Sequence, residues 1–321
     1  MGNFFTAQTP APQKLPQKPP QKTNITPVST VPKGTTRWVH TENLVDRSGS
    51  MKNMGDVCKT QNDFLNSQRE KYVTEKTELQ TKLDTLVEGV EKTNIRNKLY
   101  ELEHTTHSTC NLVTFDNKVE QPHLSVENPE VQLLENARVS EDEIKPRGST
   151  SLWDGCLKVI SNTRTLLESA PKDCETHFTI VIFTDGQENT SKKATQQDIF
   201  DQISELENSG VTIIFLGANQ DAIATAQSIG ISQKNALNVG SSEEFHGNAM
   251  RAVSDNIART RTGNGGFSTL DRSQSGALHK NTAHKLMRSP PAGLLTRQKT
   301  HNTQNNLESC PSGLLRTHTN I

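Results

Sequence analysis

Five side chains in three separate segments of the sequence could supply oxygen ligands to a metal ion. The first segment, residues 46–50, reads Asp-Arg-Ser-Gly-Ser, so that an aspartate and two serines alternate on a turn that follows an apolar segment. Carboxylate and hydroxyl oxygens are hard donors, which magnesium and calcium prefer. The candidate metal ligands in the three segments are Asp46, Ser48, Ser50, Thr150 and Asp185.

The three segments are predicted to meet at one edge of a sheet. Asp46 and Asp185 each follow directly on a predicted strand, and Thr150 opens the helix that precedes the second of these strands. In open α/β sheets, ligands bind in the crevice outside the carboxyl ends of the strands. We therefore expect the two aspartates to lie close together, with Thr150 able to reach the same place.

Predicted strands and helices alternate along the central part of the sequence. The alternation predicts an α/β fold with a doubly wound, mainly parallel sheet flanked by helices, over about residues 37–262. Strands are predicted at 37–46, 110–115, 118–124, 178–183, 211–216 and 236–239. Helices are predicted at 56–71, after residue 150, from Thr195 to about Asn208, at 221–229, and from a cap at Ser241 to about Arg261.

Two features depart from a simple sheet with covering helices. The first predicted strand contains His40, Thr41, Glu42 and Asn43, whereas a central parallel strand is normally almost continuously apolar. Residues 72–107 form an unusually polar insertion, in which apolar residues recur three and four positions apart and indicate an apolar seam on a helix. A helical hairpin packed on the main domain, a short coiled coil, or one long and mostly exposed helix would each explain this pattern.

The two ends of the sequence differ in composition from its central part. Residues 1–36 are rich in Pro, Gln, Lys and Thr, and residues 263–321 in Ser, Thr, Asn, Gly and His. Both are predicted to be disordered tails, because they cannot bury enough apolar surface to fold. The second tail is mildly basic and repeats Pro-x-Gly-Leu-Leu at 291–295 and 311–315. This repeat is either low-complexity drift or a short motif for a partner.

Composition gives a few indications of location. The net charge of -1 does not predict nucleic-acid binding, and no apolar run approaches the ~20 residues of a membrane span. The five cysteines form no CxxC pair, and no secretory signal is visible, so we expect a reducing, cytoplasmic compartment. The first six residues match the N-myristoylation pattern with Gly2 as the acceptor. Myristoylation would give weak, reversible membrane association at most, and the alternative is a plain solvated tail.

Taken together, the three oxygen-bearing segments resemble a known protein family. The stretches Val-Asp-Arg-Ser-Gly-Ser-Met, Gly-Ser-Thr-Ser-Leu-Trp-Asp and Phe-Thr-Asp-Gly-Gln-Glu-Asn look like the metal-ion-dependent adhesion site of the von Willebrand factor type A (VWA) domain. The resemblance covers residues 37–262, and all five motif positions carry the expected residue types. It implies that Ser48 and Ser50 ligate the ion directly. It also implies that Thr150, Asp46 and Asp185 act directly or through water.

The resemblance implies a non-enzymatic protein-binding module. A site built largely from neutral hydroxyls leaves Mg²⁺ or Mn²⁺ electrophilic, so that an open coordination position accepts a carboxylate from a partner protein. The family's additional acidic pair, seen in integrins, is replaced by Lys52-Asn53, so no second regulatory ion is expected. Three alternatives stay open: a vestigial site, a structural subunit of a larger assembly, and a metal-dependent hydrolase. A hydrolase needs a nucleophile or base on a metal-bound water, and none accompanies the three segments. Partner and oligomeric state are unknown.

Two other groups of polar residues bear on metal binding. Asp154 and Glu188 flank it and are expected to orient loops or to cap a helix rather than to touch metal. His104, His107 and Cys110 have a spacing that could be read as zinc ligands. Only three candidates are present there, and Cys110 is expected to start a strand, so solvated histidines are the simpler interpretation.

Overall fold

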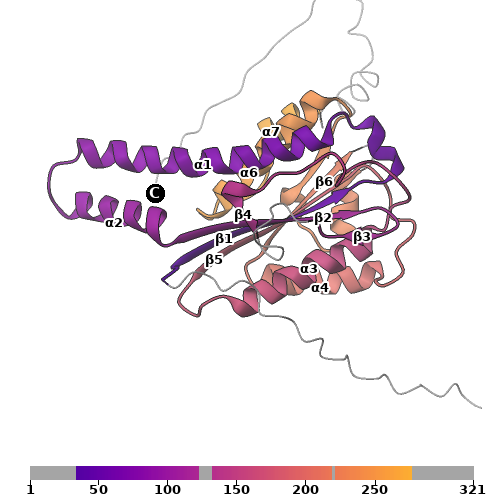
Figure 1. The fold of residues 1–321 in the computed structure, drawn as a ribbon, viewed down its shortest axis with the longest axis horizontal. Coiled ribbons are helices and arrows are strands. Elements are labelled where there is room, and N and C mark those ends of the chain that lie inside the picture. Colours follow the sequence, from indigo (N-terminus) through magenta and orange to yellow (C-terminus); the bar gives the residue numbers. More distant parts are fainter. Residues whose placement is uncertain (1–33, 123–131, 219–220, 277–321) are drawn as a thin grey trace, which may run out of the picture. The chain divides into compact units, whose positions relative to one another are not determined.

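The computed structural model describes residues 34–122, 132–218 and 221–276, whose strands form one seven-stranded sheet (Figure 1). The strand order is β3-β2-β1-β5-β6-β7, with β4 pairing separately with β2. In the spatial order β2-β1-β5-β6-β7, each strand pairs in parallel with the next, whereas β3 and β4 each pair with β2 in antiparallel fashion. The strands are β1 (Arg37–Asp46), β2 (Thr106–Phe115), β3 (Val119–Glu120), β4 (Gln132–Leu133), β5 (Glu175–Thr184), β6 (Thr212–Ala218) and β7 (Ala236–Val239).

Helices cover both faces of this sheet and create a separate core on each face. Helices α3 and α4 lie against one face, and α1 and α6 against the other (Figure 1). This arrangement confirms the predicted doubly wound α/β fold. The helices are α1 (Val57–Thr85), α2 (Val90–His104), α3 (Leu152–Ser169), α4 (Gln196–Asn208), α5 (Ala222–Ser228), α6 (Glu243–Thr260) and α7 (Thr269–Gln274), with short 3-10 helices at Gly49–Asn53, Leu134–Asn136 and Gln233–Asn235.

The polar first strand, β1, lies in the middle of the sheet between β2 and β5. Its residues 40–46 are buried, with Glu42 0% and His40 1% exposed. The carboxylate of Glu42 accepts hydrogen bonds from His40 Nε2 (3.0 Å), Asn111 Nδ2 (3.0 Å) and Asn162 Nδ2 (2.6 Å). Thr109 Oγ1 in turn contacts His40 Nδ1 at 2.9 Å. The strand tolerates Glu42 and His40 because neighbouring elements supply their partners inside the core.

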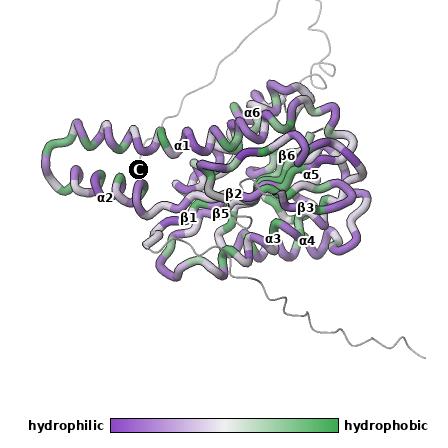
Figure 2. Tube along the Cα trace, in the orientation of Figure 1, coloured by the Kyte–Doolittle hydropathy of each residue, from purple (hydrophilic) through white to green (hydrophobic). Residues whose placement is uncertain are grey.

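The polar insertion forms a helical hairpin. Helix α1 runs past the expected end at residue 71 to Thr85, and α2 returns antiparallel to it (Figure 1). Tyr72 Oη donates to the carbonyl of Leu102 (2.8 Å), and Lys76 pairs with Glu103 (2.7 Å). Most residues of the hairpin are hydrophilic, as Figure 2 shows, whereas hydrophobic residues concentrate along strands such as β6. A hairpin therefore replaces the alternative of one long helix.

The ends of several elements differ from the sequence predictions. Thr195 caps α4 in a capping box with Asp198, as expected, but α6 is capped by Ser242 rather than Ser241. We expected the folded region to end at about residue 262, yet regular structure continues to α7. Helix α7 is fixed there by the ion pair of Arg259 with Asp271 (2.8 Å).

Several predictions concern residues outside those described. Gly2 and the Pro-x-Gly-Leu-Leu repeats are among them. Among the described helices, none combines the length and apolar character needed to cross a membrane.

Replacing Glu42 with alanine should destabilise the protein strongly, because it leaves the buried donors of His40 and Asn111 without their acceptor. Each buried polar group left unsatisfied costs about 1–3 kcal/mol, so the free energy of unfolding should fall by at least about 2 kcal/mol. Urea denaturation measures this loss. The control variant Glu205→Ala breaks an exposed ion pair with Arg164 and should change stability by no more than about 1 kcal/mol. Losses of equal size in the two variants would contradict this account of β1.

Candidate metal site

Four of the five predicted ligands form a continuous chain of hydrogen bonds. Asp46 is the last residue of β1, and its Oδ1 accepts from the amide of Ser48 at 2.6 Å. The hydroxyl oxygens of Ser48 and Ser50 lie 3.0 Å apart, and Ser50 Oγ donates to Asp185 Oδ1 at 2.7 Å. The parallel register explains the meeting: Val45 pairs with Phe183, which brings the two strands to an end at the same level.

Thr150 reaches the same place from the loop before α3. A Cβ atom added to Gly186 would lie 2.9 Å from Thr150 Oγ1 and 3.6 Å from Asp46 Oδ2, so these two oxygens border one space. Asn189 holds Thr150 there, because its Oδ1 accepts from the Thr150 amide and its own amide donates to the Thr150 carbonyl, each at 3.0 Å. Thr184 Oγ1 donates to Asp46 Oδ2 at 2.6 Å. The sequence interpretation missed both Asn189 and Thr184.

The two acidic residues that flank the site orient its loops, as expected. Glu188 Oε2 accepts from the amide of Trp153 (3.0 Å) and from Ser191 Oγ (2.7 Å), which joins the start of α3 to the loop after β5. Asp154 Oδ1 accepts from the amides of residues 192, 193 and 194 at 3.2, 2.8 and 3.2 Å. Both carboxylates thus accept their hydrogen bonds from the protein itself.

The electrostatics of the site suit a cation. Burial raises the pKa of Asp46 to about 6, although hydrogen bonds from Thr184 and Ser48 lower it. Burial also raises the pKa of Asp185. Two buried carboxylates facing one space are costly to ionise unless a positive charge lies beside them. Two carboxylates and three hydroxyls therefore provide oxygen ligands that fit a divalent cation.

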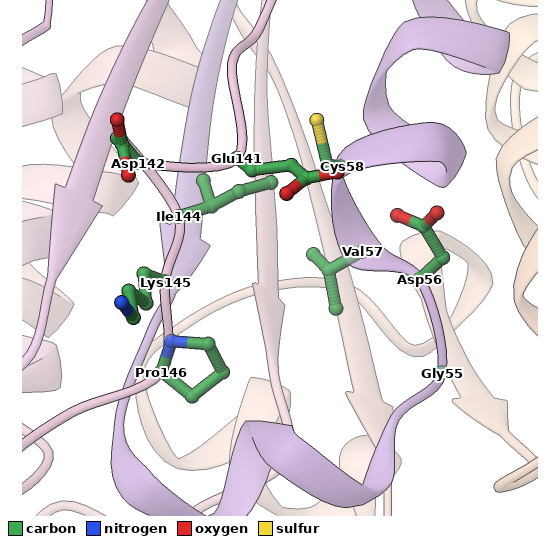
Figure 3. A pocket seen from close by; sticks show the side chains of 9 residues that line it. All are labelled: Gly55, Asp56, Val57, Cys58, Glu141, Asp142, Ile144, Lys145 and Pro146. Atoms are coloured by element: carbon green, nitrogen blue, oxygen red, sulfur yellow. The ribbon is translucent and has the colours of Figure 1, made fainter.

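A cavity of about 270 Å³ lies near these loops but does not contain the predicted ligands (Figure 3). Its walls are residues 55–58, at the start of α1, and residues 141–146, which precede the Thr150 loop. The carboxylates of Asp56 and Glu141 both lie beside Cys58 in this view, and burial followed by these charges raises the pKa of its thiol. The cavity is therefore distinct from the candidate metal site.

The described residues do not support the zinc interpretation of His104, His107 and Cys110. No group of three or more His, Cys, Asp or Glu side chains within the described ranges could hold a metal ion. Cys110 is fully buried in β2, where burial raises the pKa of its thiol to about 12, so the thiolate that zinc requires is disfavoured. The Asp46–Asp185 site is of a different kind, because three of its five predicted ligands are hydroxyls.

Comparison with known proteins gives little beyond the fold. No protein-family model matches the sequence, and no curated protein matches it. Similar solved structures include a mussel byssus protein, proximal thread matrix protein 1 with a zinc-occupied MIDAS motif (17% identity, 70% of this chain, 48% of that chain, TM-score 0.42). Another is a von Willebrand factor type A protein from Catenulispora acidiphila (11% identity, 69% of this chain, 43% of that chain, TM-score 0.41).

A third similar structure is the vWF domain of the type V pili tip protein Mfa5 from Porphyromonas gingivalis (12% identity, 73% of this chain, 98% of that chain, TM-score 0.40). This chain thus spans less than half of the first two proteins and nearly all of the third domain. The structures that this chain resembles therefore include VWA domains, at low sequence identity. Because every TM-score is below 0.5, nothing about function follows from these similarities.

Substituting Gly186 by alanine tests whether the space beside it holds an ion. The new Cβ would press on Thr150 Oγ1, so we expect Mg²⁺ affinity, measured by isothermal titration calorimetry, to fall by about tenfold or more, as when groups that orient ligands are altered. Gly247→Ala is the matched control, because nothing lies within 4 Å of its added Cβ. Equal Mg²⁺ affinity in both variants would place the ion elsewhere.

Proposed function

We propose that the described domain is a non-enzymatic, divalent-metal-dependent protein-binding module. The ion, Mg²⁺ or Mn²⁺, supplies an electrophilic position that accepts a carboxylate from an acidic residue of a partner protein. Asp46, Ser48, Ser50, Thr150 and Asp185 would hold this ion. The protein's own contribution is to keep these oxygens converged, with few negative charges among them.

The observation that carries this proposal is the convergence of three loops on one space at the carboxyl edge of the sheet. The oxygens come from segments far apart in sequence: Ser50 Oγ donates to Asp185 Oδ1 across 135 residues, and Thr184 Oγ1 donates to Asp46 Oδ2 across 138 residues. The hydrogen bonds made by the acidic residues beside the site favour binding over hydrolysis. Both nearby acids, Asp154 and Glu188, are tied to backbone amides and are poorly placed to act as a general base.

A second candidate function is a structural subunit of a larger assembly, in which the metal is secondary. The α1–α2 hairpin favours this alternative, because its surface exposes Val87 (88%) and Val90 (80%) at the turn between the helices. Large exposed apolar side chains are typical of contact surfaces when they gather in a patch.

A metal-dependent hydrolase is a third and weaker candidate. With the binding-module function we also propose a cytoplasmic location and weak membrane association through a myristoylated Gly2.

Mg²⁺ uptake and partner capture together test the proposed function. Calorimetry should show one Mg²⁺ bound by the wild type and affinity weakened by more than about tenfold in Asp185→Ala, because even changes outside the ligand set cost that much. Proteins captured by the wild type should be lost with chelator and in Ser48→Ala, but kept by the control Ser204→Ala on the exposed face of α4.

Two outcomes would contradict the proposal. Capture that is indifferent to chelator and to Ser48→Ala would favour the structural subunit. Phosphatase or ATPase turnover that requires Mg²⁺ and disappears in Asp46→Ala would favour the hydrolase.

A further inference from the structure

An arginine is buried inside the first metal loop. Arg47 lies between the first two predicted ligands, and its side chain is only 3% exposed. Its Nε donates to Asp116 Oδ2 (3.0 Å), its Nη2 to Glu120 Oε2 (2.5 Å) and its Nη1 to the carbonyl of Glu143 (3.1 Å). A buried guanidinium that uses all three of its nitrogens in this way is held in one orientation.

A second arginine, from the loop that carries Thr150, binds the same two carboxylates. Arg147 Nε donates to Asp116 Oδ2 at 2.7 Å, and its Nη2 donates to Glu120 Oε2 at 3.0 Å. Burial raises the pKa of Asp116, but hydrogen bonds from Arg147 and Lys118 and the charges of both arginines hold it below its usual range. We call Arg47, Asp116, Glu120 and Arg147 the arginine–carboxylate cluster; its formal charge is zero.

Backbone hydrogen bonds join the first two metal loops where this cluster lies. The amide of Arg147 donates to the carbonyl of Arg47 (2.7 Å), and the amide of Gly49 donates to the carbonyl of Gly148 (3.1 Å). Gly148 has φ +69°, and a Cβ there would lie 2.8 Å from Asn117 Oδ1, so the turn requires glycine. Loop 46–50 and loop 147–150 therefore meet along a short, specific seam.

We propose that the arginine–carboxylate cluster positions the ligands of the metal site by clamping its first two loops to the end of β2 and to β3. This inference rests on the proposed function and adds to it: Arg47 and Arg147 are positioning residues that act through Ser48, Ser50 and Thr150. The two loops carry three hydroxyl ligands between them, and a hydroxyl binds a cation only when it is aimed at it. Two guanidiniums that share two carboxylates fix both loops at once.

Positioning and simple electrostatics predict different outcomes. Removing the Glu120 carboxylate leaves one excess positive charge near the ion, whereas removing the Arg147 guanidinium leaves one excess negative charge. Through-space electrostatics would therefore weaken Mg²⁺ binding in the first variant and strengthen it in the second. Loss of positioning would weaken it in both.

The test uses the full chain and four variants at the cluster. Arg147 and Glu120 have side chains 52% and 46% exposed, so their replacement should leave the fold intact, unlike that of the buried Arg47. Mg²⁺ affinity is measured by calorimetry in Arg147→Gln, Glu120→Gln, the double variant and Arg147→Lys. The control Arg164→Gln removes an ion pair between α3 and α4. Thermal unfolding in chelator checks each fold without metal.

We expect each single glutamine variant to bind Mg²⁺ about tenfold more weakly, in the range seen when residues behind metal ligands are changed. The double variant should lose no more than either single variant, because the two side chains act through each other. Arg147→Lys should recover part of the affinity, and the control should match the wild type.

The inference would be overturned by affinity changes of opposite sign in the two single glutamine variants, by fully additive losses in the double variant, or by reduced thermal stability with unchanged Mg²⁺ affinity. In each of these cases, Mg²⁺ uptake by the wild type would still uphold the proposed function. A wild type that takes up no Mg²⁺ would overturn both.

Discussion

The parallel pairing of β1 with β5 is the constraint on which the candidate site depends. Because the two strands run in the same direction and in register, Asp46 and Asp185 leave the sheet at the same edge and at nearly the same level. If the two strands were antiparallel, their carboxyl ends would lie at opposite edges of the sheet, and the two aspartates could not meet. The loops that follow these strands and the loop that precedes α3 all begin near this edge. They can therefore be short and still bring their oxygens to one space.

The cost of this arrangement falls on β1, which must be both central and polar. A carboxylate in the core is expensive unless it is fully hydrogen-bonded. Glu42 meets this condition through donors on its own strand, on β2 and on α3. The network joins three elements around the strand that leads into the candidate metal loop. A polar core can thereby specify one packing of these elements, whereas apolar side chains alone would permit more.

The loops are fixed in a similar way, by charged side chains that bind backbone amides or one another rather than an ion. Glu188 and Asp154 tie the loop after β5 to the start of α3, and the arginine–carboxylate cluster joins the other two loops. Most charges near the site are thus satisfied within the protein. The hydroxyls of Ser48, Ser50 and Thr150 are the uncharged groups that we propose as ligands of the cation.

The sequence alone determined the alternation of strands and helices, the capping of α4 by Thr195, and the candidate ligands, because periodicity, caps and oxygen-bearing motifs are local signals. It could not place a polar β1 in the centre, distinguish a hairpin from one long helix, or extend the folded region to α7. Those outcomes depend on partners distant in sequence, such as Asn162 for Glu42 and Leu102 for Tyr72. Only the tertiary structure brings such residues together, since a hydrogen bond between them leaves no trace in the local pattern of either segment.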